Sequence, residues 1–151
     1  MTRDEITQQI VGARLAKGLT WQQLADAIGK PVVWTTSALL GQQPVQPDAG
    51  RKLVELLGLD ESVVSVLAAV PMRGGLPTAV PTDPTIYRFY EALQVYGPAI
   101  KELIHEQFGD GIMSAINFSV DVQKKSNPAG DRVVVTFDGK FLPYDWVAAE
   151  A

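Results

Sequence analysis

An arginine and a glutamate three residues apart, Arg88 and Glu91, have the types and spacing to do chemistry. They follow Asp83 and Pro84, which are typical of a helix start, since the aspartate caps the first turn and the proline fits the first helical position. A guanidinium is a permanent cation that can hold carboxylate-like anions through two parallel hydrogen bonds. The same spacing also suits an exposed ion pair that contributes only a few tenths of a kcal/mol. Spacing alone leaves both interpretations open.

A second candidate is the glycine-containing segment 109–114, which reads Gly-Asp-Gly-Ile-Met-Ser. Glycines let the backbone approach a ligand closely, and we expect residues 112–116 to form a helix-like turn whose free N–H groups face an anion. The hydroxyl of Ser114 would add a further donor there. The alternative is a helix stop and a turn that bind nothing.

His105 is the only histidine, which makes it the obvious candidate for a general base. A hydrolase triad with Ser114 remains an alternative, but Ser114 does not stand in the Gly-x-Ser-x-Gly elbow that such enzymes use. One histidine, no cysteine and scattered carboxylates also give no ligand spacing for a metal. We therefore expect His105 to be a surface or structural residue and the chain to hold no metal.

The first half of the chain is predicted to be a bundle of short helices. Thr2 with Glu5 and Thr20 with Gln23 form plausible capping boxes, and Gly29 is a natural stop. The expected helices lie between residues 2 and 17 and over 21–28, 31–40, 48–57 and 60–70.

Residues 19–40 resemble a helix-turn-helix of the repressor type. The helix that would enter the major groove, residues 31–40, contains no arginine or lysine. Residues 1–80 carry seven basic and seven acidic side chains, so this half offers little of the charge that holds phosphate. We expect a helical domain that does not bind nucleic acid, with a transcriptional regulator as the alternative.

In the second half, we expect helices over residues 84–96, ending at Gly97, and over 99–108. Arg88 and Glu91 would lie opposite the apolar arc of the first of these helices. That arc comprises Ile86, Phe89, Tyr90, Leu93 and Tyr96.

Alternating residues then predict strands over 117–124, 132–137 and 140–142. Residues 126–131 form a turn cluster, and Asp138-Gly139 is a hairpin-turn signal. Isolated hairpins are marginal in water, so we expect them to complete their packing in a homo-oligomer.

The 151 residues therefore predict an α+β chain of two small domains. The first, residues 1–75, is the helical bundle, and the second, residues 76–151, is a small α+β domain with β-hairpins. A linker rich in proline and glycine, residues 71–81, joins them. The longest apolar stretch, residues 63–71, is far shorter than the roughly 20 residues of a spanning helix. We expect a cytoplasmic protein that does not enter a membrane.

Three strings resemble the C-terminal domain of the cyanase (cyanate hydratase) family. Residues 81–97 read PTDPTIYRFYEALQVYG, residues 105–118 read HEQFGDGIMSAINF, and residues 138–143 read DGKFLP. The resemblance is nearly continuous from 81 to 143, and ALLGQQ at residues 38–43 resembles the helical domain that precedes it in that family.

This resemblance implies that the catalytic residues are Arg88, Glu91 and Ser114. It implies a lyase that combines cyanate with bicarbonate as co-substrate, loses carbon dioxide and leaves carbamate, which decays to ammonia and carbon dioxide. It also implies that no cofactor is needed, and that the chain forms a homodecamer, a pentamer of dimers, with active sites between subunits.

Overall fold

The computed structural model describes residues 1–74 and 78–145. The chain divides into two compact units, Met1–Gly75 and Leu76–Ala151, which are considered separately. Part of the predicted linker, residues 75–77, lies outside the described residues. Helices come first and a two-stranded antiparallel sheet follows, which confirms the predicted α+β class.

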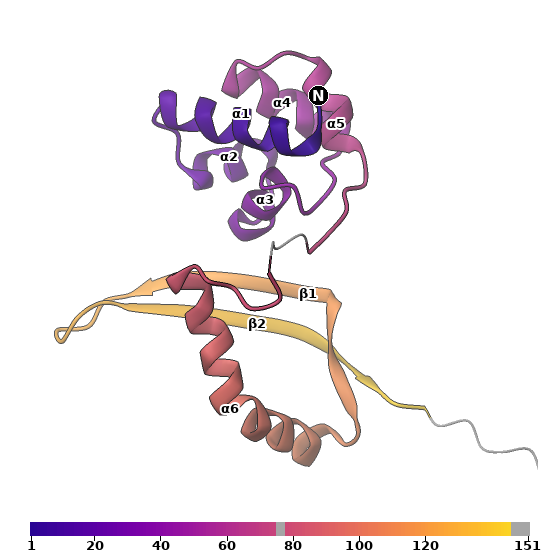
Figure 1. Ribbon diagram of the computed structural model, residues 1–151, viewed down its shortest axis with the longest axis vertical. Coiled ribbons are helices and arrows are strands. Elements are labelled where there is room, and N and C mark those ends of the chain that lie inside the picture. Colours follow the sequence, from indigo (N-terminus) through magenta and orange to yellow (C-terminus); the bar gives the residue numbers. More distant parts are fainter. Residues whose placement is uncertain (75–77, 146–151) are drawn as a thin grey trace, which may run out of the picture. The chain divides into compact units, whose positions relative to one another are not determined.

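The first unit is helical, as predicted (Figure 1). Its helices are α1 (Arg3–Ala16), α2 (Trp21–Ile28), α3 (Val32–Leu39), α4 (Pro47–Leu57) and α5 (Ser62–Ala68). Both capping boxes are present, at Thr2 and at Thr20, and Gly29 ends α2 in the left-handed conformation. The last helix is shorter than expected, since it ends at Ala68 and Ala69 is already extended. Pro71 also disfavours helix in Val70, the residue that precedes it. The helix-turn-helix arrangement of α2 and α3 stays a prediction.

The helices of the first unit enclose a core of their own. Its fully buried side chains include Ile6, Leu24, Leu39 and Leu53. The Arg3 guanidinium links α1 to α3 and α5. It donates hydrogen bonds to the carbonyl oxygens of Val66, Ala38 and Gln43, at 2.7, 2.9 and 2.8 Å. Partial burial of this guanidinium lowers its pKa from the ordinary arginine value. This unit therefore has a hydrophobic core formed by its own helices.

The second unit begins with one long helix, α6 (Pro84–Phe108), where two helices were predicted. Pro98 lies inside it, and Gly97 does not adopt a positive φ. A proline inside a helix removes one backbone hydrogen bond and bends the axis, but the flanking turns can continue. Figure 1 shows α6 changing direction partway along its length. The Gly97-Pro98 pair therefore marks a bend and not the predicted stop.

A single long hairpin follows, made of β1 (Gly111–Lys125) and β2 (Arg132–Pro143). The predicted turn cluster at residues 126–131 does join the two strands. The predicted turn at Asp138-Gly139 is wrong, because both residues lie inside β2 and pair with Ser119 and Phe118. A glycine inside a strand often marks a close approach of another backbone, and Gly139 does so here.

The second unit leaves most of its apolar surface uncovered. α6 has no buried residue, and among the described residues of this unit only Gly111 and Ser114 are buried. Phe89, Leu93 and Tyr96 of the predicted apolar arc are 46%, 53% and 64% exposed. A largely exposed apolar face of this kind is typical of an interaction surface. Within the described residues, no helix is long and apolar enough to cross a membrane.

Candidate active site

Arg88 and Glu91 lie in the first turns of α6, where the sequence places them. Asp83 caps this helix, since its carboxylate accepts hydrogen bonds from the amides of Thr85 and Ile86 at 2.9 and 3.0 Å. The predicted helix start is therefore confirmed. It sets Arg88 and Glu91 on one helical face, since residues three apart are neighbours on a helix.

The two side chains form an exposed ion pair. Arg88 Nη1 is 3.5 Å from Glu91 Oε2, and the side chains are 68% and 51% exposed. The guanidinium also lies 5.8 Å from the centre of the Tyr87 ring. The carboxylate engages one nitrogen of the guanidinium at a distance longer than a good hydrogen bond. Arg88 thus keeps donors that an anion can occupy.

Ser114 lies in a strand, and the helix-like turn predicted for residues 112–116 is wrong. The pairing of β1 with β2 is regular up to Met113, which lies opposite Phe141, and resumes at Phe118, which lies opposite Gly139. Residues 114–117 therefore bulge from the ladder with only Lys140 opposite them. β-Bulges of this kind re-aim side chains and are frequent beside active sites.

The hydroxyl oxygen of Ser114 organises this bulge. It accepts hydrogen bonds from the backbone amides of Ile116 and Asn117, both at 3.0 Å, and the residue is 5% exposed. The amides that were expected to face an anion thus face Ser114 instead. A serine hydroxyl has two acceptor lone pairs and one proton to donate. With both lone pairs engaged, the proton is left for another acceptor, so Ser114 is set up as a donor to negative charge.

One chain does not bring all three predicted residues together. Twenty residues of α6 separate Arg88 from Phe108, about 30 Å in a straight helix. Ser114 is instead beside Gly139, which lines a pocket with Ile104 and Phe108 from the last turns of the helix. In the described part of the chain, no hydrogen bond or ion pair links Ser114 to Arg88 or Glu91.

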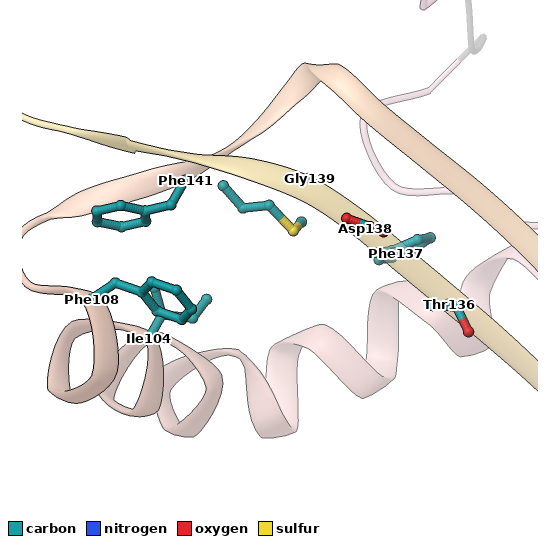
Figure 2. Close-up of a pocket in the computed structure, with 8 residues that line it drawn as sticks. Ile104, Phe108, Thr136, Phe137, Asp138, Gly139 and Phe141 are labelled. Carbon is teal, nitrogen blue, oxygen red and sulfur yellow. The ribbon is translucent and has the colours of Figure 1, made fainter.

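That pocket, of about 360 Å³, lies between the end of α6 and β2. Figure 2 shows Phe108 from the helix facing Phe141 from the strand, and these rings stack with centroids 5.2 Å apart. Among the described residues that line this pocket, only Asp138 is charged. A carboxylate repels anions unless it is paired with a cation or protonated, and neither Arg88 nor Ser114 lines this pocket.

His105 does not form a catalytic pair with Ser114. Its Nδ1 is 3.8 Å from Asp110 Oδ1 and its Nε2 is 3.4 Å from Lys101 Nζ, while the described hydrogen bonds of Ser114 Oγ all come from backbone amides. A nucleophilic serine would need its base within hydrogen-bond reach.

We predict that His105→Asn retains activity to within about threefold, whereas loss of a general base typically costs ~10²–10⁴-fold. Steady-state kinetics on the assembled variant measure this. Complete loss of turnover in an oligomer of unchanged size would make His105 the base.

A second prediction concerns the hydroxyl of Ser114. Ser114→Ala should lower kcat by ~10²–10³-fold, the usual cost of removing one donor aimed at developing charge. Ser119→Ala, at an exposed serine of the same strand, is the matched control and should have no effect. A loss below about threefold in Ser114→Ala would leave Ser114 with a structural role only.

Comparison with known proteins covers both units. Residues 3–71 match the family described as "Cyanate hydratase, N-terminal", and residues 78–146 match "Cyanate lyase C-terminal domain". The cyanate hydratase of Mycobacterium avium is 79% identical over 150 residues, which cover 99% of this chain and 97% of that protein. The cyanate hydratase of Thiobacillus denitrificans is 54% identical over 144 residues, covering 95% and 98%.

A solved structure gives the same result. The crystal structure of cyanase from T. urticae superposes with a TM-score of 0.82 at 40% identity, covering 94% of this chain and 99% of that one. Its fold is therefore shared across both units, and the sequence matches extend over nearly the whole length. The chain belongs to the cyanate hydratase (cyanate lyase) family.

Proposed function

We propose that this chain decomposes cyanate to ammonia and carbon dioxide by a bicarbonate-dependent route. The observation that carries the proposal is the 79% identity to a cyanate hydratase over 99% of the chain. The separate match of each unit to a cyanate hydratase family supports the same activity. The geometry of Arg88 and Ser114 supports the chemistry described below.

The proposed reaction joins two anions. An oxygen of bicarbonate attacks the carbon of cyanate, and the proton of bicarbonate passes to the cyanate nitrogen. The dianionic adduct then takes up a second proton from the solvent and loses carbon dioxide, as the bond between its bridging oxygen and the carboxylate carbon breaks, to leave carbamate. Carbamate takes up a proton and breaks down to ammonia and a second carbon dioxide. The step therefore needs cationic and hydrogen-bonding groups that offset the repulsion between the anions and the charge of their adduct.

Each proposed residue has a role in that charge balance. Arg88 would bind oxygens of both anions through its planar fork of donors. Ser114 would donate its hydroxyl proton to the charge that develops on the adduct. Orientation and electrostatics would then supply most of the rate, with no metal, organic cofactor or covalent intermediate.

Glu91 has a different role, because a carboxylate beside two anions is repulsive unless it is paired or protonated. Its ion pair with Arg88 supports a role in orienting the guanidinium. Transfer of a proton to the adduct is the alternative role.

We further propose that the site forms between copies of the chain. Arg88 lies near the start of α6 and Ser114 follows its end, so one copy leaves each group without the other. The exposed apolar face of α6 supports close packing of copies against each other. The proposed assembly is a homodecamer built as a pentamer of dimers. The cytoplasmic location expected from the sequence stays a prediction.

The test is ammonia release from cyanate by the full chain in buffer stripped of carbon dioxide, with and without added bicarbonate. We expect turnover to require bicarbonate and to saturate with it. Turnover that is unchanged without bicarbonate would overturn the proposed route, and an absence of ammonia release under both conditions would overturn the activity itself.

A further inference from the structure

The bulge at residues 114–117 lies between two paired positions of the hairpin. Four residues of β1 lie between the paired positions Met113 and Phe118, whereas one residue of β2 lies between Phe141 and Gly139. The surplus of three residues on β1 must fold out of the ladder. Gly139 of β2 lies next to this surplus, since it pairs with Phe118 at the end of the bulge.

Gly139 leaves no room for a side chain. A Cβ at this position would lie 2.5 Å from the carbonyl oxygen of Ser114, 2.6 Å from Met113 Cγ and 3.0 Å from Phe118 Cδ2. Real Cβ atoms essentially never approach other atoms within 3.0 Å, so something must move. Met113 has a flexible side chain that can move at low cost, but the Ser114 oxygen belongs to the backbone.

A displacement of the Ser114 backbone would act directly on its hydroxyl. The Oγ is held by the amides of Ile116 and Asn117, two and three residues further along the same bulge. Both hydrogen bonds depend on the backbone conformation from Ser114 to Asn117, because this short segment alone sets the distance between the hydroxyl and the two amides. If these bonds were lost, the lone pairs of the hydroxyl oxygen could accept other hydrogen bonds, and the hydroxyl proton would no longer be held in one direction.

We propose that Gly139 is a positioning residue for Ser114. Its missing side chain lets the Ser114 carbonyl lie against β2, which keeps the hydroxyl bonded to the two amides and its proton directed to the substrate anion. The part of this inference that concerns the anion rests on the proposed function. The part that concerns the hydroxyl and its two amides rests on the contacts alone.

Gly111 provides the matched comparison, because it is crowded in a different place. A Cβ there would collide with the carbonyl oxygen of Leu142 and lie 2.5 Å from Phe141 Cζ. An alanine at either glycine would thus strain the same hairpin. Only the alanine at position 139 would press on Ser114.

A double-mutant cycle separates positioning from general damage to the hairpin. Gly139→Ala is made in the natural chain and in the Ser114→Ala chain, and Gly111→Ala is made in both as the control. Residues that act through one another give non-additive effects, whereas independent effects add. The assembled oligomers are compared by kcat for ammonia release.

We expect Gly139→Ala to lower kcat by about 10²-fold when Ser114 is present and by less than about threefold when it is alanine. Gly111→Ala should cost the same factor in both chains. Equal losses from Gly139→Ala in both chains would overturn the proposal. If Gly139→Ala fails to assemble, the double variant Met113→Ala/Gly139→Ala takes its place in the cycle. This variant removes the clash with the Met113 side chain and keeps the clash with the Ser114 carbonyl.

A measurement without activity keeps this inference distinct from the proposed function. Hydrogen–deuterium exchange, resolved to the amides of Ile116 and Asn117, follows the two hydrogen bonds directly. We expect both amides to exchange faster in Ser114→Ala and in Gly139→Ala than in the natural chain. Unchanged exchange in Gly139→Ala would overturn the positioning role, whether or not the chain consumes cyanate.

Discussion

Replacing Arg88 by lysine should lower kcat/KM for cyanate by at least about 10²–10³-fold, although the substitution preserves the charge. The guanidinium offers five donors in a planar fork, and the pairing with Glu91 leaves donors free for oxygens of the two anions. An ammonium is a compact, strongly hydrated charge that cannot reproduce two parallel hydrogen bonds. The measurement is steady-state kinetics with cyanate and bicarbonate varied independently.

The control for this variant is Arg132→Lys, at an exposed arginine that begins β2 in the same unit. It should be indistinguishable from the natural chain in both kinetics and assembly. Sedimentation velocity should show Arg88→Lys assembled to the same size as the natural chain, because Arg88 is exposed and its described contacts are to neighbouring residues. Near-normal turnover by this assembled variant would show that Arg88 does not bind the anions.

The second large effect concerns recovery of activity by mixing two impaired chains. Arg88→Lys and Ser114→Ala should each lose most activity as homo-oligomers. If each site takes Arg88 from one copy and Ser114 from another, mixed oligomers will contain sites in which both residues are natural. In an equal, random mixture, about one site in four should be of this kind, so activity should rise to about a quarter of the natural value.

The two chains would be co-expressed with different tags and purified through both, so that only mixed oligomers are assayed. The control is the double variant Arg88→Lys/Ser114→Ala co-expressed with the natural chain. With residues drawn at random from two copies, it too gives about a quarter of intact sites, whereas a site within one copy would give about half. No recovery in the first mixture, together with half activity in the control, would contradict the shared site.

Short sequence signals correctly predicted where several helices begin and end. The capping boxes at Thr2 and Thr20 and the stop at Gly29 are where the sequence places them. Asp83 and Pro84 likewise begin α6, and the spacing of Arg88 and Glu91 produces the ion pair expected on a helix. These features were predictable because each depends on residues no more than four positions apart.

The sequence was misleading at two places where the same residues fit more than one local structure. Gly97 and Pro98 have the pattern of a helix stop, yet α6 continues through them with a bend. Asp138-Gly139 has the pattern of a tight turn, yet both residues lie inside β2. The carbonyl oxygen of Ser114, 25 residues earlier in the chain, leaves no space for a side chain at position 139. A glycine is needed equally for a turn and for a close approach, and only the paired strand distinguishes the two.

The amino-acid sequence by itself determined the helical first unit, the α+β class and the identity of the candidate residues, because caps, periodicity and long family strings are properties of the chain alone. Only the tertiary structure decided the state of the Ser114 hydroxyl. Its two amide partners depend on a bulge whose size follows from the register of β1 against β2. The tertiary structure also places Ser114 near the end of α6, whereas Arg88 lies near the start of that helix. Such distances depend on how the helix bends and how the strands pair, and these follow from contacts between residues far apart in the chain.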